Sequence, residues 1–247
     1  MFFQQNEYFY AEFLVTTNFF RKEGICMLLH FSFLLLKAGF FFIFCLVLAG
    51  IEVEAEGKNG WAEKMPTWYR TRGLAAKLYM KILGGRPLTG YHSFMFVFPC
   101  IIFHSQFFFG LQWNLSREFM SLAMYFVCMC LWDFLWFLLN PHYKWEKFRP
   151  QNIWWHSKSP WIFGLPLDYY VSWGISILFA VLAGWAGRDF NVLYDHLLLL
   201  GLLVIFTIIT IIISPQYHHW YWAMREEDDR PLAGIFHSEP ERGQGEK

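Results

Sequence analysis

Long, mostly apolar stretches limit what this chain can fold into more than any other feature of the sequence. Three of them are long enough to stand out, at residues 119–139, 167–186 and 192–213. A helix needs about 20 mostly apolar residues to cross the hydrocarbon core of a bilayer. Only 16% of the residues are charged, whereas a soluble domain has roughly 25%. The three stretches therefore predict membrane-spanning helices.

Two further stretches carry polar residues that a membrane helix has to accommodate. Residues 94–111 contain Pro99 and His104, which predicts a kinked helix inside a bundle, where neighbouring helices can satisfy polar groups. Residues 27–50 contain Lys37, at a cost of about 2.5–3.5 kcal/mol on insertion scales. The Leu and Phe residues around it each favour insertion by about 0.3–0.6 kcal/mol. We expect this segment to cross, with a re-entrant or interfacial segment as the alternative.

The sequence thus predicts an all-α, multi-pass transmembrane helical bundle of five spans, or of four if the segment around Lys37 does not cross. The five predicted spans are residues 27–50, 94–111, 119–139, 167–186 and 192–213. An irregular N-terminal segment, 1–26, is expected before this bundle of residues 27–213, because Phe and Tyr are frequent there without helical periodicity. Residues 214–247 are polar, with Gly and Pro, and predict a C-terminal tail.

Basic residues give this bundle an expected orientation. With five spans, the segments 52–93, 140–166 and 214–247 share one side and carry 15 of the 20 Lys and Arg residues, and the opposite side carries four. Cytoplasmic loops are enriched in Lys and Arg. The long loops and the C-terminus are therefore predicted to be cytoplasmic. Aromatic and basic side chains on one side favour anionic headgroups, so membrane lipids are the expected partners.

A short amphipathic helix is predicted between the first two spans. Leu74, Leu78 and Ile82 repeat every four residues, with two lysines on a neighbouring stripe, and Gly84 and Gly85 follow. This spacing places the three apolar side chains on one helix face, and a glycine pair is a common helix stop. We expect the helix to lie on the inner membrane surface.

Composition and motifs argue against several classes of protein. Twenty basic residues balance 20 acidic ones, so the charge does not fit nucleic-acid binding. The five cysteines lie in or beside apolar runs, which is typical of small buried side chains rather than of a disulfide scaffold. Motifs for serine hydrolysis, nucleotide hydrolysis, zinc proteolysis and dithiol redox chemistry have no match. These absences weaken such functions without excluding them.

Asp133 is the strongest candidate for chemistry. It lies within the predicted span 119–139, and an ionisable side chain inside a membrane is costly and rare. An aspartate at that depth has to be protonated, paired or bound to a metal. We therefore expect Asp133 to be catalytic or to bind a metal. Asp168, in the first turn of the span 167–186, is interpreted instead as a helix-capping acid.

Five histidines are possible partners of Asp133 at the cytoplasmic membrane boundary. Imidazole and carboxylate ligands suit iron or zinc. The candidate metal ligands are His104, Asp133, His142, His156, His218 and His219. Their spacing is not specific, because the chain lacks the His-x-x-x-His and His-x-x-His-His clusters of membrane desaturases and hydroxylases. The alternative is that they are interfacial histidines bonded to headgroups or to the backbone.

Two functional hypotheses follow. The first is a non-enzymatic membrane protein that binds lipid, another membrane subunit or a second copy of itself. The second is a membrane-embedded, metal-dependent enzyme that acts on a lipid or other apolar substrate, with iron or zinc held by the six residues named above. The sequence alone does not decide whether the protein is an enzyme.

Overall fold

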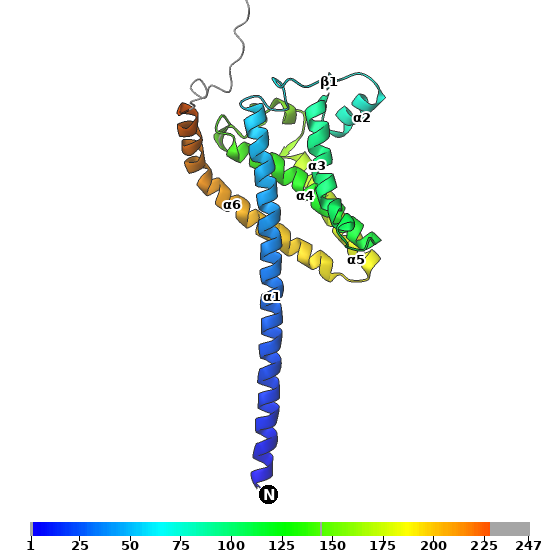
Figure 1. The fold of residues 1–247 in the computed structure, drawn as a ribbon, viewed down its shortest axis with the longest axis vertical. Coiled ribbons are helices and arrows are strands. Elements are labelled where there is room, and N and C mark those ends of the chain that lie inside the picture. Colours follow the sequence, from blue (N-terminus) through cyan, green and yellow to red (C-terminus); the bar gives the residue numbers. More distant parts are fainter. Residues whose placement is uncertain (1, 144, 228–247) are drawn as a thin grey trace, which may run out of the picture.

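Helices make up most of the chain (Figure 1). The computed structural model describes the backbone of residues 2–143 and 145–227, and the side chains of residues 24–227 except Lys144 and Glu146. The α-helices of these residues are α1 (Phe2–Glu56), α2 (Leu74–Ile82), α3 (Gly90–Phe108), α4 (Leu115–Leu139), α5 (Leu167–Gly187) and α6 (Asn191–Glu226). Short antiparallel pairs join β1 (Tyr69–Arg70) to β2 (Leu88–Thr89) and β3 (Trp161–Ile162) to β4 (Leu165–Pro166). Two single 3-10 turns cover Trp145–Lys147 and Trp154–His156.

Four helices are long and apolar enough to cross a membrane, which confirms the prediction of an all-α, multi-pass helical bundle. They are α4, α5, α6 and the part of α1 from Gly24 to Glu56. The segment around Lys37 therefore belongs to one of these four helices, and it is not the predicted span that is missing from them. α3 overlaps the predicted span 94–111 but is not among the four, because polar side chains such as His104 lower its apolar character.

α3 nevertheless packs along α4, from one end of the bundle to the other. The Asn140 side chain, just after α4, donates to the Gly57 carbonyl just after α1 (2.6 Å), so α1 and α4 end at the same side of the bundle. At the opposite end, His104 of α3 contacts Glu118 in the first turn of α4 (3.1 Å). In chain order, α3 therefore leads back from the end of α1 to the start of α4, and it is antiparallel to both helices.

The N-terminal boundary differs from the sequence-based prediction. Residues 2–26, expected to be irregular, are the first part of α1, which extends well beyond the other helices in Figure 1. This segment has no proline and one glycine, Gly24, so no residue in it forces an interruption of the backbone hydrogen bonds. An aromatic-rich segment without amphipathic periodicity can thus still be helical.

The start of the predicted tail is also helical. α6 continues to Glu226, past Pro215, where a break would be expected. Proline has no N–H to donate to the carbonyl of Ile211, and the Ser214 hydroxyl donates to that carbonyl instead (3.0 Å). This local replacement lets the helix continue through the proline. The tail residues 228–247 lie outside the described residues.

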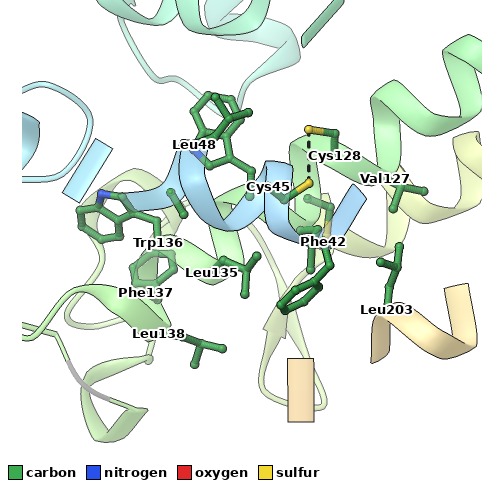
Figure 2. Close-up of a cluster of buried hydrophobic side chains, with 14 of the residues drawn as sticks. Phe42, Cys45, Leu48, Val127, Cys128, Leu135, Trp136, Phe137, Leu138 and Leu203 are labelled. Carbon is green, nitrogen blue, oxygen red and sulfur yellow. Dashed lines mark hydrogen bonds between the residues drawn. The ribbon is translucent and has the colours of Figure 1, made fainter. Parts of the chain in front are cut away.

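The core lies where α1 packs on α4 (Figure 2). Cys45 of α1 and Cys128 of α4 are fully buried, and their sulfur atoms are 3.5 Å apart. Ala38 and Ala49, on the same face of α1 as Cys45, are also fully buried. Small side chains let membrane helices approach closely. The expectation that all five cysteines are buried holds for Cys45, Cys128 and Cys130, whereas Cys26 and Cys100 are exposed.

Large apolar side chains cover the outer surface of the helices that can span a membrane. Phe40 of α1 is 74% exposed and Ile212 of α6 is 68% exposed. Soluble proteins rarely expose large contiguous apolar surfaces. These helices therefore contact lipid along their outer faces.

α2 confirms the predicted amphipathic helix. It covers Leu74–Ile82, and Gly84 and Gly85 follow with φ values of 61° and 91°, which favour glycine. The apolar stripe of Leu74, Leu78 and Ile82 is exposed. A helix with such a stripe can lie on a membrane surface.

Candidate functional site

A cavity of about 460 Å³ lies between the ends of α1, α3, α4 and α5. Much of its wall is apolar and includes Phe96, Met129 and Ile175, with Ile82 and Leu83 from the end of α2. Polar and charged side chains also line it, among them Glu52, Glu56, Arg86, His92, Asp133, His156, Asp168 and Tyr169. An apolar cavity with a few converging polar groups is the usual form of a small-molecule site.

Asp133 of α4 accepts two hydrogen bonds at the wall of this cavity. His156 Nε2 lies 3.1 Å from Asp133 Oδ2, and the Tyr169 hydroxyl, from the first turn of α5, donates to the same oxygen. The Asp133 side chain is 31% exposed. Asp133 is thus held on one side and open to the cavity on the other.

Arg86 fixes the orientation of His156. The Arg86 side chain is 8% exposed and donates to the Trp155 carbonyl (2.7 Å) and to Asp168 (2.7 Å). Its Nη2 also lies 2.6 Å from His156 Nδ1. A guanidinium can only donate, so His156 Nδ1 is an acceptor and the ring proton is on Nε2, which therefore donates to Asp133. Arg86 and His156 thus form a buried chain of hydrogen-bond donors, which ends on the Asp133 carboxylate that faces the cavity.

Asp168 completes this chain from the start of α5. Its Oδ2 accepts from Arg86, and its Oδ1 accepts from the Ser159 hydroxyl (2.7 Å). Asp168 lies in the first turn of α5, as expected, but it forms no capping hydrogen bond there with the described residues, so the interpretation as a helix-capping acid is wrong in that respect. The structure adds an ion pair with a buried arginine at the cavity, which position in the helix alone does not indicate.

A second polar group lies across the cavity wall, where α1 ends and α3 begins. Glu52 and Glu56 are one turn apart on α1, and His92 Nε2 lies 3.6 Å and 3.8 Å from their carboxylate oxygens. Thr89 caps α3 by accepting from the His92 backbone N–H (3.1 Å), which places His92 in the first turn. All three are at least nine-tenths buried. Their ligand atoms lie within 4.8 Å of one another, so these residues could hold a metal ion.

The loop after α1 covers this carboxylate pair. Trp61 and Ala62 have φ values of 54° and 53°, a left-handed conformation that costs a non-glycine residue about 1–3 kcal/mol. The Ala62 N–H donates to Glu56 (2.5 Å), and the Trp61 indole N–H donates to the Pro87 carbonyl (3.0 Å). Strained backbone held in place by its surroundings is common at functional sites.

Three donors that line the cavity have no hydrogen-bond partner among the described residues. They are the indole N–H groups of Trp132 and Trp136 and the hydroxyl of Tyr79. Burial raises the pKa of Tyr79 above that of a free tyrosine, so this hydroxyl keeps its proton. Buried donors without partners are rare in proteins, and these three can bind a polar group that enters the cavity.

The structure does not bring the six predicted metal ligands together. Asp133 and His156 are in contact, but His104 lies at the opposite end of α3, bonded to Glu118 and the Cys100 carbonyl. The other three, His142, His218 and His219, do not line the cavity.

These three histidines lie near the cavity's end of the bundle without facing into it. The His142 ring packs edge-on against Trp222, with ring centroids 5.0 Å apart. His218 Nε2 lies 2.8 Å from the Leu138 carbonyl, and His219 is exposed on α6. Helix packing turns each ring toward the backbone, toward an aromatic ring or outward, so the proposed ligand set is reduced to Asp133 and His156.

Sequence reasoning missed Glu52, Glu56, His92 and Arg86. The predicted first span ends at residue 50, so the sequence-based prediction leaves the two glutamates in a loop. A signal was present: Glu52 and Glu56 have the i, i+4 spacing that places two side chains on one helix face, directly after an apolar run. Nothing in the spacing indicates that His92, on a later helix, meets them.

No protein family, curated protein or solved structure matches this chain. The chemistry that the site can perform follows from its side chains. It combines a held carboxylate, an oriented imidazole and unbonded donors in one apolar cavity.

Proposed function

We propose that this protein is a membrane-embedded enzyme that acts on the polar end of a lipid or other apolar substrate. One observation carries the proposal: Asp133, held by His156 and Tyr169 within a helix that can span a membrane, opens into a cavity with mostly apolar walls. Placing a charged group and its partners at membrane depth is costly, and such groups usually have a function.

Asp133 is the proposed catalytic residue. A carboxylate that faces a cavity while two donors fix its position can take up or release a proton of a bound molecule. His156 is a positioning residue, because it acts through Asp133 and is itself fixed by Arg86. The unbonded N–H groups of Trp132 and Trp136 are available to hold an oxygen atom of the substrate.

The walls of the cavity suit an apolar chain. Phe96, Met129 and Ile175 supply a surface without charge, and about 460 Å³ lies within the range of roughly 300–1,000 Å³ that small-molecule sites occupy. Ile82, at the exposed end of α2, is part of the wall. A substrate that reaches α2 from the membrane surface would meet the cavity there.

The cavity is proposed to face the cytoplasm. It lies at the side of the bundle where α1 and α4 end, and the loops and tail on this side carry 15 of the 20 basic residues. This asymmetry favours the cytoplasmic side. The same cavity also suits a second function, binding of a lipid without conversion, which the apolar wall would support.

Conversion of lipid by the purified protein tests the proposal. The full chain is reconstituted with a total membrane lipid extract, and species that appear or disappear with time are measured by liquid chromatography and mass spectrometry. General acid–base groups contribute about 100-fold to 10,000-fold, so Asp133→Asn should slow conversion about 100-fold or more.

Asp195→Asn is the matched control. Asp195 is also an aspartate of a helix that can span a membrane, but it pairs with the exposed His30 (2.8 Å) and does not line the cavity. Asp195→Asn should convert the same species at the wild-type rate. If wild type changes no species, or if Asp133→Asn changes them equally fast, the protein is not this enzyme. A lipid that stays bound and unchanged would support the binding function.

A further inference from the structure

We propose that Glu52, Glu56 and His92 bind one divalent transition-metal ion, Zn²⁺ or Fe²⁺, in the wall of the cavity. None of these residues belongs to the metal ligands expected from the sequence. The role of the ion in catalysis rests on the proposed function, but its binding rests on the geometry of these three side chains alone.

The distances fit ligands arranged around an ion. His92 Nε2 is 3.6 Å from Glu52 and 3.8 Å from Glu56, both too far for a hydrogen bond. Zinc lies about 2.0–2.2 Å from nitrogen and oxygen ligands, so two ligands of one ion are separated by more than 3 Å and by less than about twice that bond length. All the ligand atoms lie within 4.8 Å of one another, so small side-chain shifts bring them onto one ion.

The orientation of His92 also fits a ligand. Its Nδ1 lies 2.8 Å from the Thr89 hydroxyl oxygen, and the Trp61 ring stacks on it with centroids 4.0 Å apart. Metal-binding histidines usually donate their second ring N–H to an oxygen acceptor, which turns the other nitrogen to the metal. When Nδ1–H donates to Thr89, the lone pair of Nε2 points between the two carboxylates.

Charge provides an independent reason for a cation at this position. Glu52 and Glu56 are only 6% and 7% exposed, and among the described residues no lysine or arginine forms an ion pair with either. Arg86, which lines the same cavity, pairs with Asp168 instead. Two carboxylates buried side by side are strongly unfavourable in their ionised form unless protons or a cation neutralise them, and a divalent ion would compensate both charges.

A neighbouring donor points to a ligand at the same place. Trp132 lines the same cavity as Glu52, its indole N–H has no hydrogen-bond partner among the described residues, and its side chain is only 2% exposed. A buried donor beside an ion can bind a water molecule or a substrate oxygen coordinated to that ion. The Trp132 N–H is therefore available to a water molecule or a substrate oxygen bound at this site.

The ligand types select the class of metal and its use. An imidazole with two carboxylates suits zinc or iron better than magnesium or calcium, which prefer oxygen ligands only. Three protein ligands leave a coordination position open, as catalytic sites do. All three ligands line the cavity, so the open position faces the space where the substrate is proposed to bind.

Metal content of the detergent-purified full chain tests this site. Protein purified without chelator, or loaded with Zn²⁺ or with Fe²⁺ under anaerobic conditions, should contain about one ion per chain by inductively coupled plasma mass spectrometry. The double variant Glu52→Gln with Glu56→Gln should retain about 0.1 ion per chain or less. Glu54→Gln is the matched control, because Glu54 lies between the two on α1 but is 57% exposed and pairs with Arg225. It should keep the wild-type content.

Titration of the wild-type chain with Co²⁺ keeps the test decisive if the double variant does not fold. Co²⁺ occupies the same ligand sets as zinc and absorbs visible light when bound. A visible spectrum that saturates at one Co²⁺ per chain and disappears when Zn²⁺ is added supports the site. Absence of a saturable spectrum in a monodisperse wild-type sample, or unchanged metal in the folded double variant, overturns it.

The outcome for the metal can be separated from the outcome for the enzyme. Asp133→Asn should keep its ion while it loses lipid conversion. A wild-type protein that converts lipid but binds no Zn²⁺, Fe²⁺ or Co²⁺ would overturn the metal site and leave the proposed function standing. A protein that binds one ion but converts no lipid would support the metal site and overturn the proposed function.

Discussion

Replacing Tyr169 with Phe removes one of the two hydrogen bonds that hold Asp133 and little else. Tyr169 is 7% exposed, and its ring packs against Phe134 and Phe148, with centroids 6.1 Å and 6.5 Å apart. A phenylalanine ring keeps these contacts. The lost group is the hydroxyl that donates to Asp133, so the substitution measures how strongly the carboxylate is held.

The expected cost follows from the geometry of Asp133. A hydrogen bond to a charged group contributes about 1.5–3 kcal/mol. Asp133 keeps its bond from His156, and 31% of its side chain stays open to the cavity. Solvent can therefore replace part of the lost bond. We expect the free energy of unfolding to fall by about 1.5–2 kcal/mol, near the lower end of that range.

The adjacent tyrosine provides a matched control. Tyr170 is 39% exposed, and its hydroxyl donates to the neutral Ile162 carbonyl (3.0 Å), so Tyr170→Phe should cost about 0.5 kcal/mol. The assay is reversible unfolding in mixed micelles, with sodium dodecyl sulfate as the denaturant and circular dichroism as the readout. If Tyr169→Phe is no more destabilising than Tyr170→Phe, the inference that Asp133 is held by two strong donors is refuted.

Three further predictions concern the surroundings of the site. Gly60→Ala places a Cβ 1.9 Å from the Trp155 ring and should destabilise the protein by about 1–3 kcal/mol through overpacking. Gly50→Ala is the control, because its Cβ meets no atom within 4 Å, and equal thermal melts for the two variants would contradict this packing. In Arg86→Lys, the lysine ammonium cannot reach all the acceptors that the guanidinium reaches. We expect about 2–3 kcal/mol lower stability in the same unfolding assay and slower lipid conversion, and an unchanged conversion rate would show that Arg86 does not position Asp133 through His156. Partial burial and nearby positive charges lower the pKa of His142, so the unfolded chain protonates this imidazole first and stability falls as the pH drops below about 6.5. His142→Gln should reduce that fall in thermal melts from pH 7.5 to 5, and a pH dependence identical to that of the wild type would contradict the lowered pKa.

Local sequence patterns were sufficient to predict most of the helices and to single out Asp133 as a candidate, whose role stays a prediction. The apolar runs predict α4, α5 and α6, and the four-residue repeat predicts α2, because both are local patterns. Asp133 stands out since a carboxylate within an apolar run needs a reason to be there. The length of α1 was underestimated at both ends, because a helix can continue past the apolar run that identifies it.

The rest of the site depends on which helix faces meet. Glu52 and Glu56 become site residues only because α3 begins beside the end of α1 and brings His92 to them. His104 was expected near Asp133, but α3 presents it to Glu118 at the far end of α4. Both outcomes are set by tertiary packing between helices distant in sequence, which the spacing of residues along one helix does not determine.

The central claim is that an apolar molecule binds in this cavity with its polar end at Asp133. Photo-crosslinking tests it most directly: the reconstituted full chain is irradiated with lipids that carry a diazirine on the acyl chain, and the labelled peptides are identified by mass spectrometry. We expect label at cavity residues such as Met129 and Ile175, in addition to lipid-facing residues such as Ile205 and Ile208. Label confined to the lipid-facing residues, with none in the cavity, would contradict the claim.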